Sequence, residues 1–146
     1  MTADHAKLTN ESEIRRLIEA RVEAIRRKDV NAVASQYEPD FVMFNLAPPL
    51  QIKAPDKKGI EEWFSGYKSA IDCEISDLNI STDNDVAFCH YLYRISGTQT
   101  SGKEVDMWVR ATLCFRKIEG KWLIVHEHDS VPFDMQTFKA LLDLKP

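Results

Sequence analysis

Hydrophobic positions near the start of the chain recur with the period of an α-helix. Asn10 and Glu13 form a candidate capping box, so a first helix is predicted to begin there. Its apolar stripe, spaced three and four residues apart, consists of Ile14, Leu17, Ile18, Val22 and Ile25. Asp29 can cap a short second helix, which Pro39 ends. A third helix is predicted from about Lys58 to Ile71.

Alternation with a period of two predicts strands through most of the remaining chain. A short strand is predicted at residues 41–44, ahead of Ala47-Pro48-Pro49. Longer strands, separated by turn signals, are predicted at residues 73–81, 86–96, 105–118 and 122–131. A short final helix is predicted near residues 135–142. Helices grouped ahead of an antiparallel meander indicate an α+β domain rather than a parallel βαβ sheet.

Composition narrows the class of protein. The length of 146 residues is that of one domain, so a single domain spanning residues 1–146 is predicted. The net charge of −4 disfavours a nucleic-acid or anionic-membrane partner. No run approaches the roughly 18 apolar residues that cross a membrane, and the N-terminus lacks a signal-peptide core. Three cysteines without CxxC spacing are typical of free thiols, so a cytoplasmic protein is expected.

One arginine interrupts the apolar stripe of the first helix. At 100° per residue, Arg21 falls among Ile14, Ile18 and Val22. A cation facing a core is costly unless it is paired. Two explanations remain: the side chain extends its head to solvent along an apolar stem, or it points into a polar pocket beneath the helix.

The two long C-terminal strands have contrasting faces. In the first strand one face is apolar and consists of Met107, Val109, Ala111, Leu113 and Phe115, whereas the other carries Trp108, Arg110, Thr112 and Cys114. In the second, His126 and His128 share one face, and Glu127 and Asp129 share the other. No face resembles a plain solvent face. One face of the sheet is expected to meet the helices, and the other a second subunit.

The segment His126-Glu127-His128 invites a metal interpretation. Two histidines on one strand face lack a clear third ligand, because only His90 or a carboxylate could supply it. We therefore expect no metal site. No nucleophile elbow supports a Ser-His-Asp triad built on Ser130. No glycine-rich phosphate loop occurs in the sequence, and no cofactor is expected.

Several segments together resemble a known superfamily. They are Ala34-Ser-Gln-Tyr37-Glu-Pro-Asp40, Gly59-Ile-Glu-Glu-Trp63-Phe64 and a tail that runs from Arg110-Ala-Thr112 through Gly120-Lys-Trp122 to Val131-Pro132. Over about residues 10–133 the chain resembles the nuclear-transport-factor-like (cystatin-like α+β) superfamily, and the tail resembles its SnoaL-like and ketosteroid-isomerase-like branch. The resemblance implies a cone: a strongly curved antiparallel sheet wrapped round a long helix, with a small-molecule pocket at the open end and a dimer formed by the outer sheet face.

The resemblance also assigns the strand faces. It places Val125, Glu127 and Asp129 in the pocket together with Trp108, Arg110 and Thr112. The apolar row of residues 109–115 and the two tail histidines would then face outward, into a homodimer interface. The isomerase's base aligns with Asn45, its oxyanion-hole tyrosine with Arg21 and its second donor with Thr112. None of these roles is kept, so strict ketosteroid isomerase activity is not expected.

A different polar set is therefore predicted for the pocket. The candidate catalytic residues are Arg21, Arg110, Glu127 and Asp129, and the candidate substrate-binding residues are Tyr37, Asn45, Trp63, Tyr67, Tyr91, Tyr93, Trp108 and Thr112. Three functions remain open. An isomerase, lyase or hydrolase would use a carboxylate as general base and an arginine to stabilise an oxyanion. A binding module would hold a carboxylate ligand with its two arginines. In a dimeric structural protein, the four charged candidate residues would pair with one another in ion pairs.

Overall fold

A computed structural model describes residues 2–53 and 55–146 of the chain. The described residues form three helices and six strands. Their order is the predicted one, except that one short strand is added before the third helix. The elements are α1 (Ala3–Arg26), α2 (Val30–Ala34), β1 (Tyr37–Phe44), β2 (Ile52–Lys53), α3 (Lys57–Ser65), β3 (Asp72–Thr82), β4 (Val86–Thr98), β5 (Glu104–Ile118) and β6 (Lys121–Ser130).

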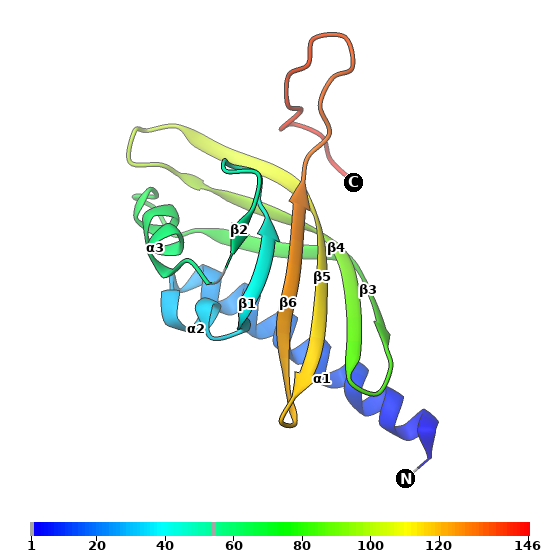
Figure 1. Ribbon diagram of the computed structural model, residues 1–146. Coiled ribbons are helices and arrows are strands. Elements are labelled where there is room, and N and C mark those ends of the chain that lie inside the picture. The colour runs from blue at the N-terminus through cyan, green and yellow to red at the C-terminus, as the bar shows by residue number, and fades with distance from the viewer. Residues whose placement is uncertain (1, 54) are drawn as a thin grey trace.

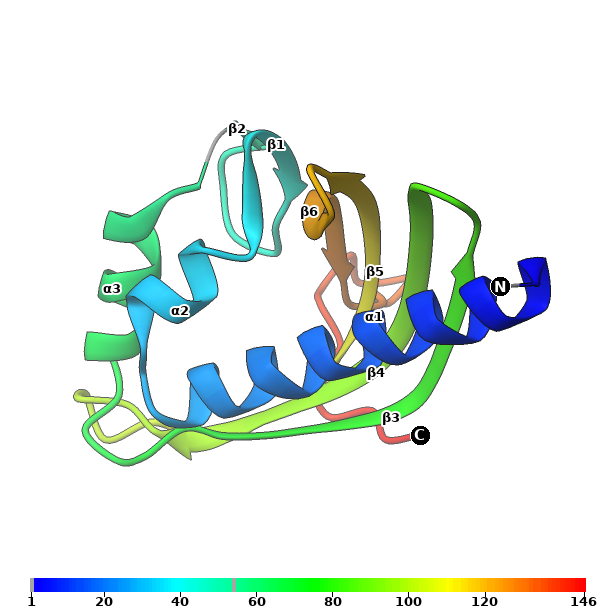
Figure 2. The same cartoon turned by 90° about the horizontal axis from the view of Figure 1, so that it is seen from below.

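The strands form one curved sheet in the order β2-β1-β6-β5-β4-β3. Neighbours are antiparallel except β1 and β6, which run parallel and bring the early part of the chain beside the last strand. Figures 1 and 2 show the sheet bending around α1, which runs across its concave side. The predicted α+β cone is confirmed. The parallel β1–β6 pair departs from a purely antiparallel sheet, because β1 reaches its neighbour from a distant part of the sequence.

The first helix begins earlier than predicted. Thr2 is its N-cap and accepts a hydrogen bond from the backbone N–H of His5. Asn10 is buried within the helix, where its side chain donates to the carbonyl of Asp83. Glu13 accepts from the indole N–H of Trp122. The capping-box interpretation was therefore wrong, because both polar side chains fasten the helix to the sheet instead of closing its end.

The other two helices are short and capped by aspartates. Asp29 accepts from the backbone N–H of Ala32 at the start of α2, as the sequence predicts. Asp56 accepts from the backbone N–H of Gly59 at the start of α3. The helix predicted near residues 135–142 does not form. That segment makes turns capped by Asp134 and projects beyond the end of β6 (Figure 1).

The apolar row of β5 lies in the core. Val109, Ala111, Leu113 and Phe115 are each at most 3% exposed, and the last three pack in the same cluster as Ile14 of α1. The expectation that this row forms a subunit interface is wrong. The alternation of β5 was read correctly, but alternation alone does not show which of two faces meets the helix layer.

A β-bulge in β6 decides which carboxylates point inward. Cys114 pairs with His126, but the next residue of β5, Phe115, pairs with Ile124, so Val125 is an extra residue. Ile124 and Glu127 therefore both face the concave side, although they are three positions apart. Strict alternation would have placed them on opposite faces. The bulge thus joins an apolar half-strand, buried under α1, to a half-strand that presents Glu127 and Asp129.

Candidate functional site

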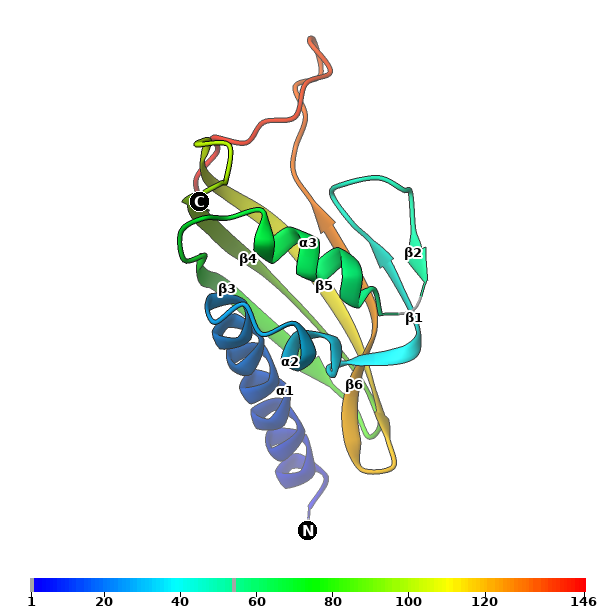
Figure 3. The ribbon, with the colours of Figure 1, turned by 90° about the vertical axis from the view of Figure 1, so that its left-hand side faces the viewer.

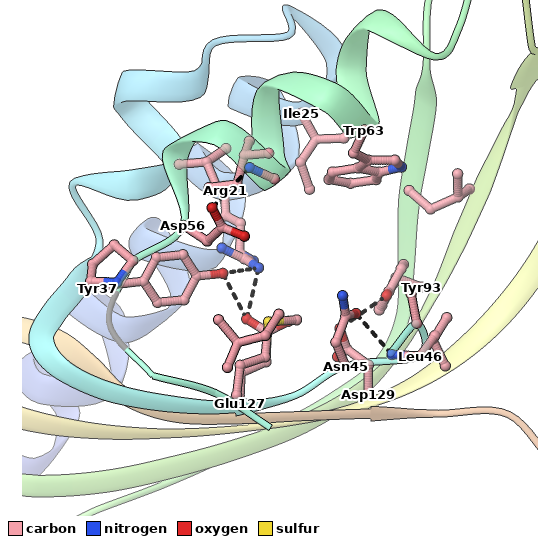
Figure 4. A pocket seen from close by; sticks show the side chains of 18 of the residues that line it. Arg21, Ile25, Tyr37, Asn45, Leu46, Asp56, Trp63, Tyr93, Glu127 and Asp129 are labelled. Atoms are coloured by element: carbon pink, nitrogen blue, oxygen red, sulfur yellow. Dashed lines mark hydrogen bonds and ion pairs between the residues drawn. The ribbon is translucent and has the colours of Figure 1, made fainter. Parts of the chain in front are cut away.

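A cavity of about 940 Å³ opens on the concave side of the sheet. It is bounded by α1, by α3 and by the turn between β1 and β2, and Figure 3 shows α3 lying across this end of the molecule. Apolar side chains form most of its walls, including Ile25, Phe41, Ile75, Ile95 and Met107. Polar side chains gather at the buried end, where α1, β1 and β6 contribute Arg21, Tyr37, Glu127 and Asp129 (Figure 4). The cavity is therefore an apolar chamber with one polar wall.

Arg21, Tyr37 and Glu127 form a closed triangle at this wall. Arg21 Nη2 lies 2.8 Å from Glu127 Oε1 and donates to the Tyr37 hydroxyl at 2.6 Å. The Tyr37 hydroxyl donates to the same Glu127 oxygen at 2.9 Å. Arg21 is 8% exposed and Glu127 2%. The buried arginine therefore points into a polar pocket and does not extend its head to solvent.

Electrostatics hold Arg21 in its charged form. Burial lowers the pKa of Arg21, but the surrounding acidic groups, Glu127 first among them, together outweigh that effect and the pKa rises. Burial has the opposite effect on Tyr37: it raises the pKa of the phenol, which favours the neutral form. Arg21 Nη1 is buried and has no hydrogen-bond partner among the residues that the structure describes. One donor of the guanidinium is therefore left over.

Asp129 is the carboxyl group that stays available. It is 5% exposed, and its Oδ2 accepts a long hydrogen bond of 3.3 Å from the Tyr93 hydroxyl. Its Oδ1 is buried and has no partner within residues 2–53 and 55–146. Burial raises the pKa of Asp129 well above its ordinary value, and the neighbouring charge of Glu127 raises it further. The protonated acid is favoured, so the side chain can donate a proton at the cavity wall and take one up again only after it has done so.

Aromatic rings complete the walls. Tyr91 and Tyr93 lie side by side with ring centres 6.1 Å apart, and burial raises the pKa of both phenols. Trp63 lies at the mouth and is 37% exposed. The side-chain oxygen of Asn45, also at the mouth, accepts from the backbone N–H of Leu46. These residues line the cavity, as the sequence analysis expected of them.

Four expected site residues do not line the cavity. Arg110 and Thr112 are exposed on the outer face of the sheet, where Arg110 Nε donates to the Ser130 hydroxyl. Trp108 shares their face, because it also alternates with the buried row of β5. Tyr67 is buried but pairs with Gln99 beyond α3. The expectation that these four line the pocket is wrong, and so is the placement of Val125, the extra residue of the bulge, which does not line the cavity. For the β5 residues the cause is the inverted face assignment.

Some cavity residues escaped the sequence analysis. Met43 lies opposite Glu127 in the parallel β1–β6 pair, a pairing that no local pattern reveals. Lys53, Asp56 and Glu62 lie at the mouth. The spacing of Asp56 and Gly59 carries a detectable helix-cap signal, which places a polar side chain at that edge.

The histidines of β6 lie outside the cavity lining. His126 Nδ1 lies 2.7 Å from the carbonyl of Val42, and both His126 and His128 meet the edge of Phe44. Across residues 2–53 and 55–146, no group of three or more His, Cys, Asp or Glu side chains is placed to hold a metal ion. Cys73 lines the cavity, but burial raises the pKa of its thiol to about 11, so it is a poor nucleophile.

The family model for the SnoaL-like domain matches residues 14–134. The chain belongs to the SnoaL-like family. No curated protein matches this SnoaL-like chain. Within the part of the chain that the structure describes, no helix is both long enough and apolar enough to cross a bilayer.

Solved structures agree with the family assignment. An NTF2-like protein of unknown function from Pseudomonas putida KT2440 is 34% identical, with a TM-score of 0.86 over 95% of this chain and 98% of that one. A provisionally named dehydratase of the NTF2-like family from Streptomyces avermitilis is 19% identical, with a TM-score of 0.73 over 88% and 97%. The association domain of C. elegans CaMKII is 18% identical, with a TM-score of 0.68 over 86% and 98%. The last two likenesses show the fold alone.

Proposed function

We propose that this SnoaL-like domain binds a small molecule in the cavity and transfers a proton on it, in an isomerisation, an elimination or a hydrolysis. The observation that supports this most directly is the Asp129 carboxyl, buried at the cavity wall with one oxygen unpartnered among the described residues. A structural ion-pair network would leave no such oxygen beside a cavity. A carboxyl with a raised pKa is suited to general acid–base catalysis near neutral pH.

Glu127 and Asp129 have different roles in this proposal. Glu127 already accepts hydrogen bonds from Arg21 and Tyr37, so it is a positioning residue and not the base. Burial and the negative charge of Glu127 keep the proton on Asp129, so Asp129 donates it to the ligand oxygen as general acid while a water molecule takes the carbon-bound proton. Arg21 keeps one free donor, Nη1, with which to stabilise negative charge that develops on the ligand. Of the two candidate arginines, only Arg21 lines the cavity, because Arg110 lies on the opposite face of the sheet.

The experiment is a proton-exchange assay. A panel of small aryl and alicyclic ketones is incubated with the protein in D₂O, and loss of the protons next to the carbonyl is followed by NMR. Asp129→Asn keeps the shape of the side chain but cannot carry the proton. We expect it to slow exchange by about 10²–10⁴-fold, the usual contribution of a general acid or base. The matched control is Asp143→Asn on the exposed tail.

Two outcomes of this assay separate the candidate functions. Exchange that depends on Asp129 supports catalysis. Saturable binding of the same ketones without exchange, in both wild type and Asp129→Asn, supports the second candidate, a non-catalytic binding module. That candidate draws on the closed triangle of Arg21, Tyr37 and Glu127, which commits most of the polar wall to internal hydrogen bonds.

We also propose that the chain acts as a homodimer in the cytoplasm. The outer face of the sheet carries two exposed aromatic rings, Phe44 at 38% and Phe88 at 47%. Exposed apolar side chains that share one face are typical of interaction surfaces. The cytoplasmic location is supported by Cys73, Cys89 and Cys114, which are all free thiols.

A further inference from the structure

We infer that the cavity accepts uncharged molecules with a hydrogen-bond acceptor and rejects carboxylates of the same shape, because Glu127 already neutralises Arg21. The inference rests on the proposed ligand-binding function and adds the class of ligand. An arginine in an apolar pocket usually suggests an acidic ligand. Here the position that a ligand carboxylate would occupy on the guanidinium is taken by the protein's own carboxylate, 2.8 Å away.

The charges at the buried end nearly cancel without a ligand. Arg21 contributes one positive charge and Glu127 one negative charge, and their side chains are 10% and 3% exposed. Burial raises the pKa values of Asp129, Tyr37, Tyr91 and Tyr93, which favours the neutral form of each. The charged residues Lys53, Asp56 and Glu62 lie at the mouth, formed by β2, the segment that follows it, and α3. A carboxylate at the polar wall would leave a net negative charge in a water-poor site, which is costly.

The same wall presents hydrogen-bond donors that need an acceptor. Arg21 Nη1 is buried without a partner in the described part of the chain, and a protonated Asp129 has an O–H to give. A neutral carbonyl or ether oxygen can accept from such donors and adds no charge. An unsatisfied buried donor costs free energy, so a ligand that satisfies it gains affinity. Figure 4 shows Arg21, Glu127 and Asp129 lining one cavity, with Tyr37 and Tyr93 beside them.

The remaining walls define the body of the ligand. Phe41, Ile75, Ile95 and Met107 line the chamber, and Trp63 lies at its mouth. A volume of about 940 Å³ is at the upper end for small-molecule sites, which leaves ample room for a two-ring molecule. The ligand class is therefore an apolar, ring-sized molecule that carries one neutral acceptor.

The test uses two probes of equal shape and different charge, 2-acetylnaphthalene and 2-naphthoate. Dissociation constants are measured by fluorescence titration of the wild-type protein at pH 7.5. We expect the ketone to bind at least about tenfold more tightly than the carboxylate, which corresponds to about 1.4 kcal/mol. A naphthoate affinity equal to or above that of the ketone overturns the inference. Failure of the ketone to bind at millimolar concentration also overturns it.

Glu127→Gln should reverse the preference, because it leaves Arg21 with an uncompensated charge. We expect naphthoate to gain at least about tenfold in affinity and the ketone to change by less than about threefold. Glu11→Gln, at the exposed ion pair with Arg15 on α1, is the matched control, since it removes the same charge outside the cavity lining and should keep the wild-type ranking. Naphthoate should also raise the melting temperature of Glu127→Gln more than that of wild type. Unchanged naphthoate binding by a folded Glu127→Gln protein overturns the inference. If that variant does not fold, the wild-type ranking decides.

The outcomes also separate this inference from the proposed function. A ketone preference without proton exchange supports the ligand class and removes the catalytic role of Asp129. A naphthoate preference together with exchange that depends on Asp129 supports the catalytic role and overturns the inferred ligand class. The two proposals therefore stand or fall on different measurements.

Discussion

At the scale of single residues, Asp129 links the stability of the protein to pH. Its pKa is raised in the folded protein, so between the unfolded value near 3.9 and the folded value the native state holds a proton that the unfolded chain has lost. The free energy of unfolding must fall as pH rises through this window, by about 1.4 kcal/mol per unit of pKa difference. Asp129→Asn cannot ionise and should lack this loss. Urea denaturation of both proteins at pH 5 and pH 8 measures the difference, and parallel pH profiles would contradict the assignment.

A second prediction at this scale concerns the contribution of the Arg21–Glu127 ion pair to the free energy of unfolding. Glu127→Gln leaves the buried Arg21 without a compensating charge, so we expect a loss of about 3–5 kcal/mol in the free energy of unfolding. The double variant Arg21→Met with Glu127→Leu removes both charges and should recover most of that loss. Glu62→Gln, at an exposed ion pair with Lys58, is the control and should cost less than about 1 kcal/mol. Equal losses for the single and the double variant would show that charge is not the cause.

Some of the site was predictable from the residues themselves. Arg21 stands out because a cation interrupts an apolar stripe, and the structure gives it a buried partner. The inward direction of Glu127 and Asp129 rested on resemblance, because alternation offers two equivalent faces. Arg110, Trp108 and Thr112 were misplaced for the same reason. The apolar stripe of an amphipathic helix shows which face is buried. A strand with one apolar and one mixed face does not show which of its faces meets the helices.

At the scale of elements, the bulge at Val125 determines the chemistry of β6. Deletion of Val125 restores strict alternation, which either turns Glu127 and Asp129 away from the cavity or exposes Trp122 and Ile124. We expect this deletion to lower the free energy of unfolding by at least about 3 kcal/mol, the cost of an unpaired buried charge. Val125→Ala keeps the extra residue and should cost less than about 1.5 kcal/mol. Thermal unfolding measures both variants, and a deletion as mild as the substitution would mean that the bulge is dispensable.

The helices and strands themselves were largely predictable, and their ends were not. Asp29 caps α2 where the sequence indicates, because an aspartate before a short apolar repeat acts locally. Asn10 failed as a cap because Thr2 begins the helix two turns earlier, and the side chain of Asn10 then finds a partner in Asp83. The parallel pairing of β1 with β6 joins residues far apart in the chain. No local pattern contains that information.

At the scale of the whole molecule, the proposed homodimer can be tested by mass. Size-exclusion chromatography with light scattering should give twice 16.8 kDa at micromolar concentration. Phe88→Asp places a charge on the outer face of the sheet and should shift the population to monomer. Phe138→Asp alters an aromatic ring of the projecting tail, 76% exposed, and serves as the control. Dissociation by the tail variant alone would assign the interface to the tail instead of the sheet.

The cavity is assembled from two kinds of chain segment, and this has an evolutionary consequence. Its mouth comes from one nearly continuous stretch, residues 45–53 and 55–63, whereas its polar end combines distant side chains of α1, β1 and β6. Substitutions, insertions or deletions in the mouth segment can reshape the entrance while the proton-carrying end stays intact. Selection can therefore change which molecule enters without rebuilding the groups that act on it. In such a fold, the residues of the mouth can change quickly and admit new ligands, while the buried polar residues change slowly.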